Sequence, residues 1–533
     1  MRTSRSIFPS ILLSLALSSA ALAQLAGQPD RIRSFLEGLD AGDAPIIAGE
    51  RLLEPDLVSR VYRDRDHAPL WVDRGPLAAQ VPGLLSAISR SVGHGFAPER
   101  YHRSVLEKLL AAEDAPSRTA LEILLTDAFL GQALHRGRGA VFPPNLDANW
   151  QLPQAEVDAV ALLANSAAER AEIPTVLEAL WPADPEYWRL VERRAEIAAS
   201  GDETTVQIAA GPLLKPGQTS DRVILLKQRL MGPGEHTPVY DDDLRREVVA
   251  FQRAAGLEPD GLVGANTLEV MNATRVSWIE RIDANLERWR WLPRQSPETY
   301  IRVNIAAFTL RVMDKGVPAL SMNVIVGQPY RQTPVFTETL KYMVLNPYWN
   351  VPYSIATKDK LPALKKNAAA EAAKGFEVKP QGSDRFVAVD ALDWSNTNAR
   401  NFNVLLRQKP GPQNALGRIK FMMPNPHAVY LHDTPSRELF ARQERSFSSG
   451  CIRLEQPLVL ARWLLSREAH PAADSLDSML ASNETRTVNL KEHVPTYLVY
   501  FTAFSLEDGE VTFRRDIYER DAVVIAALRE QNR

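Results

Sequence analysis

Apolar and polar positions divide the chain into a helical first part and a strand-rich last part. Leu121 to Leu134 places apolar residues at near-helical spacing, and residues 24–205 as a whole predict a mostly helical scaffold domain. In the last part, Ile301, Val303 and Ile305 alternate with polar residues, which predicts a half-buried strand. The pattern therefore favours an α+β multidomain protein.

Between these parts, residues 211–273 predict a compact module of three short helices. Gly256 is placed to end the second helix, and Gly264 precedes the third. A module this small has no nucleophile and no acid–base pair in an apolar pocket, so we expect it to bind a partner or act as a spacer. The apolar faces of the first two helices are formed by Val223, Leu226 and Leu230, and by Leu244, Val248 and Phe251.

The strand-rich region, residues 298–521, predicts a mixed β-sandwich. It ends in a hairpin at the turn dipeptide Asp508-Gly509, and residues 522–533 are expected to form a C-terminal tail. Residues 354–408 break the strand pattern and contain an Ala-rich helical run. Their length favours an inserted capping lid over a plain loop, with a surface insertion of no function as the alternative.

The first 23 residues have the pattern of an export signal. Arg2 and Arg5 form a basic start, Ile7 to Ala23 is mostly apolar, and Ala21-Leu22-Ala23 is a small-residue cleavage site. We therefore expect cleavage after Ala23 and a periplasmic protein, with an uncleaved anchor as the alternative. No later stretch approaches the roughly 20 apolar residues that span a bilayer, so no membrane span is expected after signal removal.

Charge and cysteine content narrow the function. A net charge of -3 and a pI near 6.4 argue against a nucleic-acid partner. The single cysteine, Cys451, cannot form an internal disulfide, although exported proteins normally pair their cysteines or lack them. An unpaired thiol in an exported protein therefore indicates that the thiol takes part in a reaction. The alternative is a buried structural cysteine, which its polar neighbours do not favour.

The surroundings of Cys451 are those of a cysteine nucleophile. It lies in the run Ser-Ser-Gly-Cys-Ile-Arg, downstream of His432, which ends a predicted strand. His432 is the expected general base and acid, while His427 is a competitor in a predicted loop. A backbone carbonyl or Asp433 would orient His432. We favour the carbonyl, because an adjacent side chain points to the opposite face of an extended chain.

Other residues in the same two segments are expected to support the chemistry. The backbone N–H groups of Gly450 and Cys451 are placed to stabilise an oxyanion. Tyr430 lies two residues before His432 and so shares its face of the strand. The fixed charge of Arg453 would favour the thiolate or bind a substrate carboxylate.

These blocks resemble the YkuD-type catalytic domain of L,D-transpeptidases. The likeness is to the large periplasmic subgroup, which carries a scaffold domain, a peptidoglycan-binding domain and a capping insertion. Phe251 to Asn272 resembles that peptidoglycan-binding domain, with a helical spacer that binds nothing as the alternative. Ser449 stands where commoner members have His, which leaves His432 as the base. Supporting blocks are Asn285 to Pro293, Tyr300 to Phe308, Val326 to Phe336, Leu345 to Pro352, Asn414 to Phe421 and Tyr497 to Asp521.

The resemblance implies a reaction. Cys451 would attack the carbonyl of residue 3 of a tetrapeptide stem, normally meso-diaminopimelate, and His432 would protonate the leaving D-Ala. The amine of a second stem would then accept the acyl group, forming a 3→3 cross-link in peptidoglycan. The resemblance also implies inhibition by carbapenems, possible wall-synthesis protein partners, and no metal or cofactor. Substrate-binding residues would be Tyr348, Trp349, Asn350, Ser448 and Ser449.

Three alternatives stay open. Water as acceptor would make an L,D-carboxypeptidase, and a protein lysine as acceptor would make an enzyme that acts on wall-attached protein. A lid that shields the thioester from water favours transfer to an amine. A non-catalytic wall-binding protein with a decayed site is the third alternative, against which the intact His432 and Cys451 argue.

Overall fold

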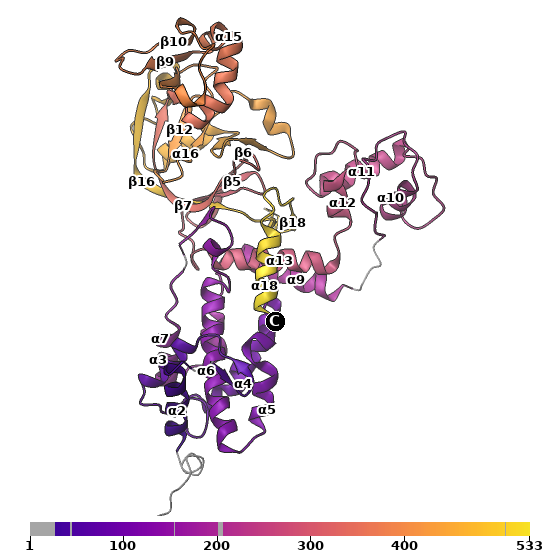
Figure 1. Cartoon of the computed structure of the whole chain (residues 1–533), viewed down its shortest axis with the longest axis vertical. Helices are drawn as coiled ribbons and strands as arrows, with labels where there is room; N and C mark the ends of the chain where they lie inside the picture. The colour runs from indigo at the N-terminus through magenta and orange to yellow at the C-terminus, as the bar shows by residue number, and fades with distance from the viewer. Residues whose placement is uncertain (1–26, 43–44, 154, 201–205, 507, 533) are drawn as a thin grey trace, which may run out of the picture. The chain divides into compact units, whose positions relative to one another are not determined.

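The computed structural model describes residues 27–42, 45–153, 155–200, 206–506 and 508–532, so the expected export signal lies outside the described residues. The chain forms two compact units, which Figure 1 shows coloured along the chain. The first comprises residues 1–138, 156–181 and 531–533, and the second comprises residues 139–155 and 182–530. None of the described helices has the length and apolar character needed to cross a bilayer.

The first unit is a helical assembly around α6. Every residue of α6 from Thr119 to Gly137 is buried, which confirms the helix predicted over Leu121 to Leu134 and identifies it as the central one. A helix surrounded on all sides needs apolar residues on all sides, and this explains their dense spacing. The helices of the unit are α2 (Gln28–Asp40), α3 (Pro55–Arg63), α4 (Val81–Arg90), α5 (Arg103–Leu110), α6 (Ala115–Arg138), α7 (Ala159–Glu169) and α8 (Ile173–Glu178), beside the short strands β1 (Ile46–Ile47) and β2 (Glu50–Arg51).

A buried carboxylate in α6 ties a connecting segment to the central helix. Glu122 accepts hydrogen bonds from the backbone N–H groups of Leu70, Trp71 and Val72 at 2.5, 2.9 and 2.9 Å. The hydroxyl of Tyr62 donates a further bond at 2.8 Å. Burial raises the pKa of Glu122, and these hydrogen bonds act against that rise.

The three-helix module lies in the second unit and has the predicted helices. They are α10 (Asp221–Met231), α11 (Asp242–Ala254) and α12 (Ala265–Met271), and Figure 1 shows them side by side. Gly256 follows the end of α11 with φ +67°, the left-handed conformation that favours glycine at a helix C-terminus. The module has its own core, formed by Ile208, Leu214, Val223, Leu226, Tyr240, Leu244, Val248, Val263, Leu268 and Met271.

Helices outside the module support the strand-rich region. Residues 521–531, which the sequence placed largely in a tail, form helix α18 (Asp521–Gln531). Its first residue, Asp521, is buried and forms ion pairs with Arg288 at 2.6 Å and Arg281 at 3.3 Å. The other helices are α9 (Pro185–Ala199), which the sequence assigned to the scaffold, α13 (Arg275–Arg290), α16 (Pro457–Arg467) and α17 (Leu476–Ala481).

The strand-rich region is built on one curled ten-stranded sheet. Its main path runs β12-β13-β15-β6-β5-β4-β16-β7-β3, with β14 paired to β6. Strand β12 also pairs with β7, so the path closes on itself. The strands are β3 (Trp150–Gln151), β4 (Tyr300–Asn304), β5 (Thr309–Asp314), β6 (Val317–Gly327), β7 (Val335–Leu345), β12 (Ile419–Met422), β13 (Leu431–His432), β14 (Ser446–Ser448), β15 (Ile452–Leu454) and β16 (Arg486–Val499). The predicted terminal hairpin consists of β17 (Ala503–Ser505) and β18 (Val511–Phe513).

Strand β4 corrects one expectation, because it is buried on both faces rather than half-buried. Its polar residue Arg302 forms ion pairs with Asp184 and Glu186 and lies over the ring of Trp289, 5.1 Å from the ring centroid. The side chain of Asn304 donates to the carbonyl of Phe501 at 3.0 Å. Polar residues that alternate with apolar ones along a strand can therefore face a second layer of protein, to which they form hydrogen bonds and ion pairs, instead of water.

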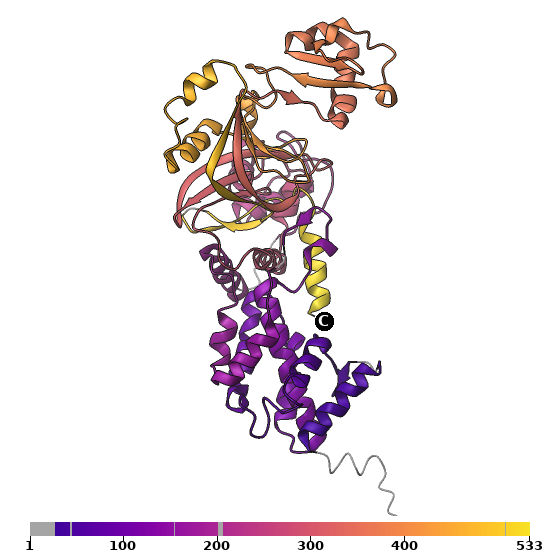
Figure 2. The same ribbon diagram turned by 90° about the vertical axis from the view of Figure 1, so that its left-hand side faces the viewer.

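The segment that breaks the strand pattern is a subdomain with its own core (Figure 2). Its four-stranded sheet has the order β10-β9-β11-β8. Trp349, Phe376, Trp394 and Leu406 are among the buried residues of its core. Its elements are β8 (Trp349–Asn350), α14 (Tyr353–Ile355), α15 (Leu361–Ala373), β9 (Phe376–Pro380), β10 (Val387–Ala388) and β11 (Val404–Gln408). We call residues 349–408 the capping insertion.

The buried carboxylate of α6 gives a stability prediction. In Glu122→Gln, an amide replaces one acceptor oxygen with an N–H₂ group, so at least one buried backbone N–H loses its partner. We expect the free energy of unfolding of the first unit to fall by about 1–3 kcal/mol. Urea denaturation of the full chain measures this. Glu107→Gln, at an exposed position on α5, is the matched control, and equal stability of the two variants would contradict the assignment.

Candidate active site

Three neighbouring strands bring the sequence-predicted residues together. Lys420 of β12 pairs with His432 of β13 in antiparallel register, and His432 pairs with Arg453 of β15 in parallel register. Tyr430 and Cys451 each lie two residues before a member of this row. Since side chains two apart in an extended chain share a face, all five gather on one face of the sheet.

His432 is held as a neutral base. Its Nδ1 lies 2.5 Å from the backbone carbonyl oxygen of Asp433 and donates to it, which leaves Nε2 free to accept a proton. The Asp433 carboxylate points elsewhere and accepts from the N–H groups of Arg418 and Thr434. Burial, and then the charge of Arg453, lower the pKa of His432 to about 3. The imidazole is therefore uncharged at neutral pH.

Cys451 is half-buried, and its thiol is also neutral at rest. Burial raises the pKa of the thiol, while hydrogen bonding with Tyr430 and the charges of Lys420 and Arg453 act in the opposite direction. Sγ donates to the carbonyl of Ala428 at 3.7 Å. The resting thiol therefore points to a backbone carbonyl, and it must rotate to pass its proton to an imidazole.

The loop before the nucleophile is fixed by one buried serine. The Ser448 hydroxyl donates to the carbonyl of Cys451 at 2.5 Å and accepts from the N–H of Gly450 at 3.1 Å. Gly450 has φ +114°, a conformation that other residues rarely adopt. Its carbonyl accepts from the Thr333 hydroxyl at 2.8 Å. Ser448 thus holds the loop rather than facing a ligand.

This loop geometry corrects the expected oxyanion hole. The Gly450 N–H already donates to Ser448, so it does not face a reacting carbonyl. The Cys451 N–H forms no hydrogen bond with the residues that the structure describes. Of the two N–H groups expected to form the hole, that of Cys451 is the one that remains available to an oxyanion.

Ser449 is exposed and joins the nucleophile loop to the capping insertion. Its hydroxyl accepts from Nη1 of Arg331 at 2.9 Å. The same guanidinium forms a bidentate ion pair with Asp359 of the insertion, at 2.6 and 3.0 Å. We call this set the Arg331 bridge. It connects the loop that carries the thiol to the subdomain beside it.

The three residues expected to line a cleft separate in the structure. Tyr348 is exposed, and the guanidinium of Arg407 lies 4.3 Å from its ring centroid. Asn350 is exposed and pairs with Arg407 across the β8–β11 ladder. Trp349 instead packs in the core of the capping insertion, where its ring centroid lies 6.0 Å from that of Phe376. Trp349 therefore supports the insertion from within.

Lys420 is the site residue that sequence reasoning missed. Its Nζ lies 3.9 Å from the ring centroid of Tyr430, and burial lowers its pKa. Neither Lys420 nor Arg453 has a carboxylate partner among the described residues, and Nε of Arg453 is buried without a hydrogen bond. In the sequence, Lys420 alternates with apolar neighbours like any solvent-facing strand residue. Only its pairing with His432 across the β12–β13 ladder shows that it is a site residue.

Comparisons with known proteins match separate regions of the chain to three domains. A family model of the L,D-transpeptidase catalytic domain matches residues 298–488. Models of a scaffold domain and of a putative peptidoglycan-binding domain match residues 56–193 and 219–271. A putative L,D-transpeptidase of Haemophilus influenzae is 34% identical over 242 residues, which are 45% of this chain and 48% of the relative. The chain thus spans about half the length of this curated relative.

Solved structures of L,D-transpeptidases also align with part of the chain. One, in complex with imipenem, is 14% identical with a TM-score of 0.19, and covers 38% of this chain and 59% of its own. Another, from Xylanimonas cellulosilytica, is 14% identical with a TM-score of 0.17, and covers 54% of this chain and 98% of its own. Because these TM-scores are low, the assignment comes from the domain models and the sequence relative. Along the chain, three regions thus match, in order, models of a scaffold domain, a putative peptidoglycan-binding domain and an L,D-transpeptidase catalytic domain.

Proposed function

We propose that the protein is a periplasmic L,D-transpeptidase that forms 3→3 cross-links between peptidoglycan stems. One observation carries the proposal: a thiol, an imidazole with Nε2 free and two cations without carboxylate partners in the described part of the chain share one face of three strands. A putative peptidoglycan-binding domain in the same chain supports peptidoglycan as substrate.

The first half-reaction uses the neutral pair. The thiol of Cys451 rotates from the Ala428 carbonyl toward Nε2 of His432 and gives up its proton as sulfur attacks the carbonyl of residue 3 of the donor stem. The imidazolium then protonates the D-Ala amine as the C–N bond breaks, which leaves a thioester. A His with a strongly lowered pKa returns its proton readily, so it suits this transfer to the leaving amine.

The second half-reaction reverses these steps with a new amine. The diaminopimelate amine of a second stem attacks the thioester and loses its proton to Nε2 of His432, and sulfur leaves as the thiol. In both tetrahedral intermediates the Cys451 N–H is placed to donate to the oxyanion. The hydroxyl of Tyr430 is the second donor that we propose. Burial raises its pKa, so it stays protonated.

The two cations give the site a preference for acidic peptides. Lys420 and Arg453 flank His432 and act on the charge of Cys451. A carboxylate of the donor stem would supply the missing counter-charge, and stems that contain diaminopimelate carry such carboxylates. Removing a buried cation from water without a partner is costly, so an acidic ligand stabilises the occupied site.

The capping insertion bears on the choice between transfer and hydrolysis. The Arg331 bridge ties it to the nucleophile loop, so the insertion is placed to limit the access of water to the thioester. This favours transfer to an amine over L,D-carboxypeptidase activity. Acylation by carbapenems is part of the same proposal, because a strained lactam presents the carbonyl that Cys451 attacks.

The reaction itself is tested on tetrapeptide-rich wall fragments. We expect the full chain without its export signal to yield stem dimers, and Cys451→Ala to yield none because it lacks the nucleophile. Mass spectrometry of the products measures both. Tripeptides without dimers would show that the protein acts as an L,D-carboxypeptidase and not as a transpeptidase. Unchanged fragments in both samples would reject stem peptides as the acceptor in this assay.

The role of Lys420 is tested without substrate, by the pH dependence of Cys451 alkylation by iodoacetamide. The Lys420 charge lowers the pKa of the thiol, so Lys420→Met raises that pKa further. We expect the rising limb of the rate profile to move to higher pH, with alkylation at pH 7 several-fold slower. Lys341→Met, at an exposed position of β7, is the control. Equal or faster alkylation of Lys420→Met would refute this electrostatic role.

The Arg331 bridge predicts a change in product ratio. Asp359→Asn removes the charge that holds Arg331 on the insertion, so water should reach the thioester more often. We expect the ratio of tripeptide to dimer to rise by at least about twofold. Asp384→Asn, at an exposed position in the same insertion, should leave the ratio unchanged. A ratio that stays constant in both variants would show that the bridge does not exclude water.

A further inference from the structure

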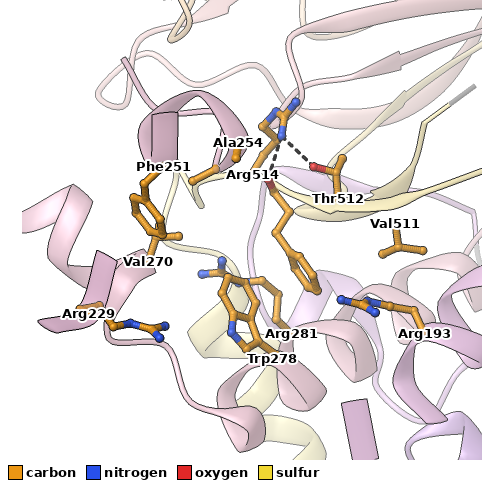
Figure 3. Close-up of a pocket in the computed structure, with 12 residues that line it drawn as sticks. Arg193, Arg229, Phe251, Ala254, Val270, Trp278, Arg281, Val511, Thr512 and Arg514 are labelled. Atoms are coloured by element: carbon orange, nitrogen blue, oxygen red, sulfur yellow. Dashed lines mark hydrogen bonds between the residues drawn. The ribbon is translucent and has the colours of Figure 1, made fainter. Parts of the chain in front are cut away.

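A cavity of about 290 Å³ is formed within the second unit by the three-helix module, helices α9 and α13, and the terminal hairpin (Figure 3). None of its lining residues belongs to β12, β13 or β15, the strands of the active site. Its volume is near the lower end of the range of ligand pockets, about 300–1,000 Å³. The cavity is therefore a separate candidate binding site.

The charge of the lining is one-sided. Among the residues that the structure describes, four arginines line the cavity, Arg193, Arg229, Arg281 and Arg514, and no aspartate or glutamate does. Arg281 is compensated from outside the cavity by Asp521 and Glu269, and Arg193 by Glu196 on the same helix.

The other two arginines have only neutral partners among the described residues. Nη2 of Arg229 donates to the carbonyl of Met271 at 3.4 Å. Nη1 of Arg514 donates to the Thr512 hydroxyl at 3.0 Å and to the carbonyl of Phe513 at 2.9 Å. Burial without a carboxylate lowers the pKa of Arg514. An anion in the cavity would supply the charge that both lack.

An aromatic pair lies between these charges. Trp278 of α13 and Phe513 of β18 have ring centroids 4.3 Å apart at an interplanar angle of 52°, and both remain partly exposed. Figure 3 shows Trp278 between Arg229 and Arg193. Partly exposed aromatic faces beside guanidinium groups suit a ligand that combines a flat apolar face with carboxylates.

The module and the hairpin also meet closely beside this site. A Cβ atom on Gly256 would lie 2.7 Å from the side chain of Arg514, and Gly256 already has φ +67°. Glycine at the end of α11 therefore leaves room for the Arg514 side chain beside the module. This places Arg514, which directly follows strand β18 of the hairpin, against the module. The hairpin segment and the module can therefore contact the same ligand.

We propose that this cavity binds a carboxylate-bearing sugar–peptide strand of the wall polymer, with carboxylates on Arg229 and Arg514 and a sugar ring against Trp278 and Phe513. The strand would then be held jointly by the module and the hairpin while Cys451 acts on a stem. The identity of the polymer rests on the proposed function, whereas the preference for an anionic ligand rests on the cavity itself.

The test is sedimentation of the full chain with purified diaminopimelate-type sacculi, in a Cys451→Ala background so that binding does not depend on catalysis. We expect the double variant Arg229→Gln, Arg514→Gln to bind about tenfold more weakly, because each guanidinium loses a charge-assisted bond. Arg246→Gln, at an exposed position of α11 paired with Asp243, is the matched control and should bind like the parent. Sacculi whose carboxyl groups are methyl-esterified should bind the parent at least as weakly as untreated sacculi bind the double variant.

Equal binding of the double variant and the parent would overturn the proposal, as would undiminished binding to esterified sacculi. Each single variant is measured as well, with thermal unfolding to confirm that it folds like the parent. With Cys451 intact, the double variant should keep wild-type turnover of small soluble tetrapeptides, since the cavity lies on other elements. Loss of binding with turnover retained supports this site, while absent turnover in every protein would count against the proposed function alone.

Discussion

The pairing of β13 with β12 on one side and β15 on the other is the constraint on which the site depends. It sets His432 between Lys420 and Arg453, and it brings Cys451, which directly precedes β15, to the same face of the sheet. A shift of one residue in either pairing would turn a whole set of side chains to the opposite face. Leu431 and Ile452 alternate with the site residues along β13 and β15, and both are buried. The core on the other face of the sheet therefore fixes the register.

This register also decides the charge state of the site. Burial first, and then the charges of Arg453 and Lys420, lower the pKa of the imidazole and keep it unprotonated, and the same cations act against the rise that burial gives to the thiol pKa. The result is a neutral thiol and a neutral base, rather than a preformed ion pair. In the proposed reaction, proton transfer accompanies attack on the substrate, and the cations are left to recognise a carboxylate. The proposal thus gives one geometric arrangement two roles, in the nucleophile and in substrate selection.

Much of the fold could be predicted because its signals are local. The central helix α6, the three-helix module and the terminal hairpin follow from spacing and turn residues along the chain, and Cys451 and His432 stand out by type and neighbourhood. Lys420 could not be found in this way, since its role comes from a partner strand. Trp349 was misplaced for a similar reason, because sequence does not show that β8 joins the core of the capping insertion.

Other differences arise from partners that only the folded chain supplies. The Gly450 N–H has a side-chain acceptor two residues away, and β4 is buried because Arg302 finds carboxylates near the start of α9. Helix α18 forms where a tail was expected, since Asp521 is neutralised by two arginines of α13. For Arg302 and Asp521, a polar residue that looked exposed in the sequence is satisfied by a distant segment.

The closure of the sheet has a consequence for how the enzyme can change. The capping insertion leaves the sheet after β7 and returns to it at β12, and these two strands are paired to each other. The insertion is thus attached at both ends to one ladder whose register is set without it. It can lengthen, shorten or open as a body while Lys420 keeps its place beside His432. Substrate access and catalytic geometry can therefore evolve separately.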